Sequence, residues 1–244
     1  MSEFLVFSDA DHLHRAAAQR FAALASNAIA ERGRFTVALA GGSTPRPFYA
    51  LLAGEPGSHV QAVVEEIDWA HVQLFWGDER CVPPSHPDSN YRMARRALLD
   101  RVPIPPENVH RMRGELPPEE GAAAYRWELQ QALGADGRLD VVFLGLGTDG
   151  HTASLFPGST ALHERQRSVV AVYVEKLASW RLTLTLPVIN AARHVIFLVA
   201  GQNKADPLAR VRAGEPLPAA RVQPSRGQLT WLVDRDAAAG PEHR

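Results

Sequence analysis

Continuous apolar segments that alternate with helical segments restrict the fold of this chain more than any other feature of its sequence. FTVALAG (35–41), LDVVFLGLG (139–147) and HVIFLVA (194–200) are almost entirely apolar, as is typical of strands buried on both faces of a sheet. HVQLFWGDE (71–79), VVAVYV (169–174) and LTLTL (182–186) are further strand-like segments, and Ser89 is expected to cap a helix over residues 89–102. Residues 11–32 repeat apolar side chains every three or four positions before Gly33, as amphipathic helices do. This alternation predicts a three-layer α/β fold, in which a mostly parallel, Rossmann-like sheet is flanked by helices on both faces.

The composition suits a globular protein. The chain has 244 residues, of which 45% are hydrophobic, and no linker-like stretch divides it. We therefore expect a single domain over residues 1–244, with a frayed tail at 236–244. The 26 basic and 27 acidic side chains give a formal net charge of −1, so nucleic acid is not an expected partner. Either a monomer or a weak homodimer is compatible with this sequence.

The single cysteine, Cys81, rules out an internal disulfide, and a reducing, cytoplasmic location is expected. No signal peptide is expected at the N-terminus. The apolar segments are too short to cross a bilayer, so no membrane partner is expected either.

Three loops that leave predicted strands carry unusual chemistry: AGGSTPRP (40–47), WGDERCVPPSHPDSNY (76–91) and GLGTDGHTASLFPGS (145–159). In parallel α/β sheets the ligand binds beyond the carboxyl ends of the strands. The three loops are therefore predicted to form one shared site.

Gly145, Gly147 and Gly150 spell the G-x-G-x-x-G of a dinucleotide site. That site also needs a long crossover helix after the third glycine. Pro157 interrupts any such helix after about two turns, which argues against a nicotinamide cofactor, although Glu175 does end the next strand-like segment as the motif requires.

His151 follows the last of these glycines. A short helix starting at His151 or Thr152 would aim backbone N–H groups and its positive dipole end at an anion or oxyanion. The dipole would also favour a neutral imidazole, which can act as a general base, and Asp149 could orient the ring. The alternative is that His151 merely caps a helix.

Gly41, Gly42, Ser43 and Thr44 form a glycine-hydroxyl turn at a predicted helix start, which resembles a phosphate cradle without a P-loop lysine. A simple helix cap is the alternative.

Three basic residues could hold an anion. Arg80 follows Asp78 and Glu79 at a strand end and could bind a phosphate or stabilise an oxyanion. Lys204 and Arg181 are further candidates, although each of the three could instead be a solvated surface group. No His, Cys and carboxylate set has metal-ligand spacing, so no metal is expected.

Four segments together resemble the 6-phosphogluconolactonases, in the superfamily that includes glucosamine-6-phosphate deaminase. They are LAGGSTP (39–45), FWGDERCVPPSHPDSNY (75–91), GLGTDGHTASLFPGS (145–159) and RLTLTLPVINAARHVIFLVAGQNKA (181–205). The likeness runs in the family's order over most of the chain. One departure is EKLASW, where the family has a proline-rich run before the arginine matched by Arg181.

This resemblance implies a glucosamine-6-phosphate deaminase-like fold. It also implies hydrolysis of 6-phospho-D-glucono-1,5-lactone to 6-phosphogluconate, in the oxidative pentose phosphate pathway, without a metal or other cofactor. His151 matches the family's catalytic base and Arg80 its active-site arginine. Residues 41–44 match its phosphate-contacting turn, and Lys204 and Arg181 match basic positions near the phosphate.

The implied chemistry needs an oxyanion stabiliser and an orienting group for the base. Backbone N–H groups from Gly147 to His151, or the Arg80 side chain, could stabilise the oxyanion. Asp149 or Asp78 could orient His151.

Two rival functions remain. Glucosamine-6-phosphate deaminase needs an additional carboxylate base, carried in a loop like M-D-E-Y, whereas this chain has WGDERCVP. A non-catalytic sugar-phosphate sensor would need a DNA-binding module, for which no segment is expected, and would have no use for His151.

Overall fold

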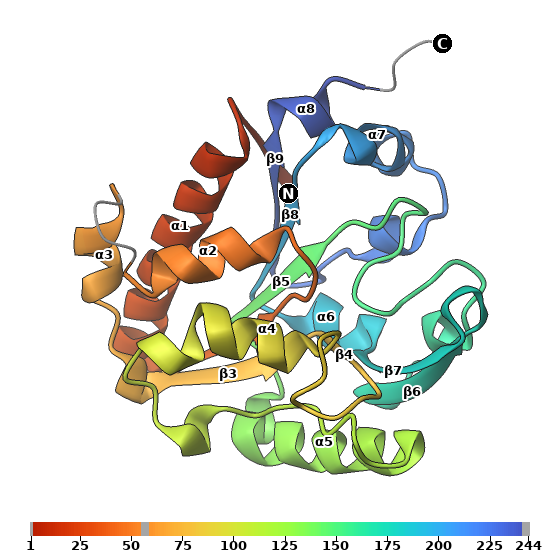
Figure 1. The fold of residues 1–244 in the computed structure, drawn as a ribbon, viewed down its shortest axis with the longest axis horizontal. Coiled ribbons are helices and arrows are strands. Elements are labelled where there is room, and N and C mark those ends of the chain that lie inside the picture. Colours follow the sequence, from red (N-terminus) through yellow and green to blue (C-terminus); the bar gives the residue numbers. More distant parts are fainter. Residues whose placement is uncertain (1, 55–58, 241–244) are drawn as a thin grey trace.

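A parallel sheet lies between two layers of helices (Figure 1), in a computed structural model that describes residues 2–54 and 59–240. All neighbouring strands of this main sheet run parallel. In spatial order they are β1 (Ser2–Phe7), β9 (Gln228–Asp234), β8 (His194–Val199), β5 (Val141–Gly145), β2 (Phe35–Leu39) and β3 (Val72–Trp76). The predicted α/β fold with its mostly parallel sheet is confirmed.

The helices divide between the two faces of the main sheet. One face packs against α1 (Ala10–Arg32), α2 (Pro45–Leu52), α3 (Gln61–Glu65) and α4 (Asn90–Ala97). The other face packs against α5 (Pro118–Leu133), α6 (Leu186–Ala191), α7 (Ala205–Arg212) and α8 (Arg235–Ala238). Among residues 2–54 and 59–240, no helix is long and apolar enough to span a membrane.

Burial on both faces explains why the strand segments are continuously apolar. In β5, Val141 and Phe143 pack toward α1 and α2, whereas Val142 and Leu144 pack toward α5. The Phe143 ring lies 5.0 Å from that of Phe48 on α2, between centroids. Burying each such side chain contributes roughly 1.5–3 kcal/mol, so this layer is a major source of stability.

The predicted helix ends are confirmed where a capping residue marks them. Gly33 has φ +73° and donates its N–H to Ile29 O, which ends α1. Ser89 accepts the N–H of Arg92 at the start of α4, as expected of a capping serine.

The strand expected at residues 71–79 breaks at Gly77. Its N–H donates to Leu39 O, and its own carbonyl accepts from Leu184. The chain thereby leaves the main sheet and enters a small antiparallel sheet, in the order β4 (Asp78–Arg80), β7 (Ser179–Leu184) and β6 (Val169–Val174). VVAVYV forms β6, as expected, and belongs to this small sheet. Of LTLTL only residues 182–184 are strand, at the end of β7, because Leu186 already begins α6.

The C-terminal segment expected to fray from residue 236 is ordered over its first part. Residues 236–238 belong to α8, and Ala237 is 1% exposed and packs in the core. That part of the prediction is wrong because the apolar alanine is buried. Residues 241–244 lie outside the described residues.

The strand order reverses between β2 and β5. The chain proceeds from β2 outward to β3, and from β5 outward in the opposite direction to β8 and β9. The loops after β2 and β5 therefore diverge at their carboxyl ends, which creates the crevice that such sheets use for ligands.

At the other end of the sheet, where the strands begin, Asp140 links the start of β5 to β2. Its carboxylate accepts from Thr36 N at 2.8 Å and Thr36 Oγ1 at 2.9 Å, and it forms ion pairs with Arg32 and Arg193. The Asp140 side chain is 7% exposed.

We expect Asp140→Ala to lower the free energy of unfolding by about 3 kcal/mol, because it leaves buried donors unsatisfied and removes the buried acidic partner of Arg32 and Arg193. Denaturant unfolding would measure this. Asp136→Ala, which removes only an exposed partner of Arg193, should change the free energy by no more than about 0.5 kcal/mol. Equal effects of the two variants would contradict the assigned role of Asp140.

Candidate active site

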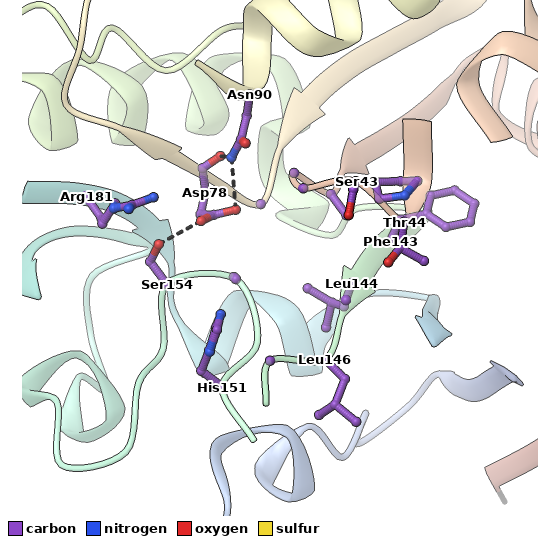
Figure 2. Close-up of a pocket in the computed structure, with 18 of the residues that line it drawn as sticks. Ser43, Thr44, Asp78, Asn90, Phe143, Leu144, Leu146, His151, Ser154 and Arg181 are labelled. Atoms are coloured by element: carbon purple, nitrogen blue, oxygen red, sulfur yellow. Dashed lines mark hydrogen bonds between the residues drawn. The ribbon is translucent and has the colours of Figure 1, made fainter. Parts of the chain in front are cut away.

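A pocket of about 360 Å³ lies at this reversal of the strand order (Figure 2), within the range typical of small-molecule sites. All three loops predicted to share a site contribute to it. The predicted site residues that line it are Gly41, Gly42, Ser43, Thr44, Asp78, Arg80, Gly147, His151, Arg181 and Lys204.

Two predicted site residues lie behind this lining. Asp149 contacts the ring of His151 from the outer side. Gly150 does not line the pocket: it has φ +79°, lies against Leu217, and its carbonyl accepts the N–H of Ala219. Its role is to shape the turn, for which a residue without a side chain is needed.

The loop from Gly147 to His151 is not the start of a helix, so the predicted helix at His151 or Thr152 is wrong. The loop folds back on itself: Gly147 N–H donates to His151 O at 2.8 Å, and Gly150 N–H donates to Gly147 O at 3.0 Å. Thr152 Oγ1 closes the turn by donating to Gly145 O at 2.9 Å. No helix dipole therefore acts on His151.

The same hydrogen bonds remove most of the backbone donors expected for an oxyanion. The N–H groups of Gly147 and Gly150 are used within the loop, and that of His151 donates to Asp149 Oδ1 at 3.1 Å. An anion in the pocket must therefore rely mainly on other donors.

His151 is held by a carboxylate and an aromatic ring. Its Nδ1 lies 2.5 Å from Asp149 Oδ1, and its ring stacks on Phe156 with centroids 4.2 Å apart. Partial burial raises the pKa of Asp149, but hydrogen bonds from Lys176 and His151 outweigh this and lower the pKa to about 2. An ionised carboxylate only accepts hydrogen bonds, so Nδ1 carries a proton, and in the neutral form of the ring Nε2 is then the nitrogen with the lone pair.

Asp78 does not orient His151, which settles which of the two aspartates contacts the ring. Its carboxylate accepts from Ser154 Oγ at 2.7 Å and from Asn90 Nδ2 at 3.4 Å, while Asn90 also donates to the Asp78 carbonyl at 2.9 Å (Figure 2). Asp78 thus joins the His151 loop to the start of α4.

Glu79 is a buried anchor that the sequence analysis missed. It is 2% exposed and accepts from Ser89 Oγ, Asn90 N and Tyr91 N at 2.8–3.0 Å, and from Arg80 N at 2.7 Å. Burial raises the pKa of Glu79. The only signal in the sequence was the position of Glu79, directly before Arg80 and ten residues before Ser89, which was predicted to cap a helix.

Two glycines make room for side chains of the site. A Cβ on Gly41 would overlap the amide of Asn90, and a Cβ on Gly147 would overlap the imidazole of His151. Asn90 and Ser154, which also line the pocket, are further site residues that local sequence patterns did not indicate.

Arg80 and Arg181 are paired across β4 and β7. The Nε of each is buried without a hydrogen-bond partner, while an Nη of Arg80 donates to Asp88 O. Within the described residues, neither has a carboxylate partner. Burial lowers the pKa of Arg181, and the charge of Arg80 lowers it further, yet arginine stays protonated in proteins. Two adjacent guanidinium groups without a carboxylate partner favour an anionic ligand.

The turn at residues 43–44 and Lys204 form another polar part of the pocket. Thr44 precedes α2 without a side-chain cap bond, so its hydroxyl does not act as the simple helix cap that was the alternative. His14 Nε2 fastens this turn through Thr44 O at 2.8 Å, a contact that sequence patterns did not indicate. Burial lowers the pKa of Lys204.

In the described part of the chain, no group of three or more His, Cys, Asp or Glu side chains could hold a metal ion. The polar groups of the pocket instead fit an anionic organic ligand.

A model of the glucosamine-6-phosphate isomerases/6-phosphogluconolactonase family matches residues 8–231. The chain belongs to this family. A curated 6-phosphogluconolactonase from Nostoc sp. is 46% identical over 224 residues, which cover 88% of this chain and 87% of the relative. The human 6-phosphogluconolactonase is 42% identical over 240 residues, with 96% and 91% covered. The resemblance noted in the sequence is confirmed.

Solved structures agree with this family membership. The crystal structure of 6-phosphogluconolactonase from Thermotoga maritima has a TM-score of 0.84 at 28% identity, and covers 96% of this chain and 100% of that one. A monomeric glucosamine-6-phosphate deaminase has a TM-score of 0.79 at 20% identity, over 97% and 99% of the chains. At that identity the likeness concerns the fold alone.

We expect Gly147→Ala to displace the imidazole of His151, because the new methyl group would occupy the same space. Nitrogen-edited NMR of the histidine rings should show loss of the Nδ1–H signal that is hydrogen-bonded to Asp149. Gly145→Ala is the matched control, since a Cβ there has no atom within 4 Å, and it should leave the signal unchanged. An unaltered signal in Gly147→Ala would contradict the proposed fit.

Proposed function

We propose that this chain is a 6-phosphogluconolactonase, which hydrolyses 6-phospho-D-glucono-1,5-lactone to 6-phosphogluconate in the oxidative pentose phosphate pathway. Its family membership and the names of its relatives support this activity. The observation that carries the proposal is the Asp149–His151 pair, whose imidazole lines a pocket that also contains the basic side chains of Arg80, Arg181 and Lys204.

His151 is the general base in this proposal. Nε2 takes a proton from a water molecule, whose oxygen attacks the lactone carbonyl carbon. When the tetrahedral intermediate collapses, the bond between that carbon and the ring oxygen breaks, and the imidazolium returns its proton to the ring oxygen. Asp149 keeps Nδ1 protonated and stabilises the imidazolium, as a carboxylate does for a histidine base.

Arg80 and Arg181 are the groups we assign to the anionic oxygens of the substrate. Both side chains line the pocket, and neither has a carboxylate partner in the described residues, so their positive charges are already in place for an anionic oxygen. Arg80 takes the oxyanion role because the backbone donors of the His151 loop are mostly used elsewhere.

The phosphate end of the substrate is assigned to Ser43, Thr44 and Lys204, together with the small turn at Gly41 and Gly42. The hydroxyls and backbone N–H groups precede α2, whose N-terminus favours an anion, and Lys204 adds a positive charge. Binding the remote phosphate positions the lactone ring for attack.

Glucosamine-6-phosphate deaminase activity is less well supported, because that reaction needs a further free carboxylate. Asp78 is bound by Ser154 and Asn90, and Glu79 by several donors at the start of α4. A sensor that only binds sugar phosphate would need no carboxylate-oriented imidazole.

We expect His151→Ala to lower lactone turnover by about 10²–10⁴-fold, the usual contribution of a general base, while binding of 6-phosphogluconate persists. Consumption of freshly prepared lactone above its spontaneous rate measures turnover, and glucosamine-6-phosphate is the negative control. His71→Ala, which removes an exposed histidine paired with Asp68, should behave as wild type. Wild-type turnover in His151→Ala would refute the assignment.

We expect Arg80→Ala to lower kcat/KM by about 10²–10³-fold, as loss of an oxyanion donor does. Arg80→Lys should recover only part of this, because an ammonium group lacks the planar fork of guanidinium. An unchanged kcat/KM in Arg80→Ala would show that Arg80 takes no part in the reaction.

A further inference from the structure

Lys176 contacts both groups that hold the His151 ring. Its Nζ donates to Asp149 Oδ2, the oxygen opposite the one that meets His151. The same ammonium lies 4.6 Å from the centroid of the Phe156 ring, on which His151 stacks. Lys176 does not line the pocket itself, so it reaches the ring only through Asp149 and Phe156.

The turn between β6 and β7 holds Lys176 in place. It is a single helical turn, Glu175–Leu177, followed by Ala178 at φ +44°. Tyr173 and Trp180 pair across the two strands below it, with ring centroids 5.5 Å apart. Leu177, the next residue, lines the pocket. The hairpin therefore places the ammonium group of Lys176 next to Asp149.

The use of lysine in this chain is sparse. Of its 26 lysines and arginines, only Lys176 and Lys204 are lysines. Lys204 lines the pocket, and its ammonium interacts with the charge of Asp149. Both lysines of the chain therefore act on the same carboxylate.

We propose that Lys176 is a positioning residue for the reaction: it fixes Asp149 and offsets its charge, so that His151 is oriented but stays unprotonated and able to accept a proton. This inference rests on the proposed function, since it concerns the base of that reaction.

The negative charge of Asp149 interacts with two groups, His151 at Oδ1 and Lys176 at Oδ2. A carboxylate facing an imidazole alone favours the imidazolium, which cannot act as a base. A lysine on the second oxygen opposes this and restrains the carboxylate. The other charged groups around this cluster are Asp78, Arg80, Arg181 and Lys204 across the pocket, and Glu119 and Glu175 on the outer side.

Lys176→Met tests the proposal. Without the positive charge, protonation of His151 becomes easier, so the acidic limb of the profile of kcat/KM against pH should move to higher pH by about half a unit. At neutral pH kcat should fall about 3- to 10-fold because Asp149 is also less restrained, while KM stays nearly constant. The Lys176 side chain is 52% exposed, so the fold should be retained.

Two variants serve as controls. Lys176→Arg keeps the charge and should retain the wild-type pH profile. Arg95→Met removes an exposed basic partner, that of Asp100, away from the pocket, and should change neither kcat nor the profile. Lys176→Gln provides a second neutral side chain and should repeat the result of Lys176→Met.

The outcomes separate this inference from the proposed function. A wild-type protein that does not hydrolyse the lactone would reject the proposed function. An active wild type with an unchanged pH profile and kcat in Lys176→Met would overturn only the role of Lys176. A raised KM with an unchanged profile would also overturn it, because Lys176 would then bind substrate directly.

Discussion

The hydrogen bonds of two adjacent carboxylates, Asp78 and Glu79, connect the segments that form the pocket. Asp78 joins the His151 loop to α4 through Ser154 and Asn90, and Glu79 binds the first turn of α4. Burying a carboxylate is costly unless several donors compensate it, and here each carboxylate accepts more than one hydrogen bond. These hydrogen bonds therefore connect the loop after β3, which carries Arg80, with α4 and with the loop after β5, which carries His151.

That use of the acidic groups leaves the basic groups of the pocket available. Asp78 and Glu79 are bound by neutral donors, while Arg80 and Arg181 keep unpartnered Nε–H groups in the described structure. The chain as a whole has a net charge of −1, so its overall field does not attract an anion. The affinity that we propose for a sugar phosphate therefore depends on a local feature, in which the acidic groups are hydrogen-bonded and the basic groups have no acidic partner.

The sequence predicted the layers, the helix ends and the three loops of the site, because each depends on local periodicity or on one capping residue such as Gly33 or Ser89. It failed at His151, where the pattern suggested a helix start. There the turn is closed by bonds among its own backbone groups and by Thr152 reaching Gly145. The contact of Lys176 with Asp149 spans 27 residues, and no local pattern indicates such a pair.

The glycines of the G-x-G-x-x-G pattern also acquire a physical explanation. In a dinucleotide site the second glycine lets the backbone approach the pyrophosphate. Here the space beside Gly147 is filled by the imidazole of His151, and the space beside Gly41 by the amide of Asn90. The missing side chains thus make room for groups of the protein itself. A glycine that makes room for a neighbouring side chain and one that makes room for a cofactor look identical in sequence, and only the group that occupies the space beside the glycine distinguishes them.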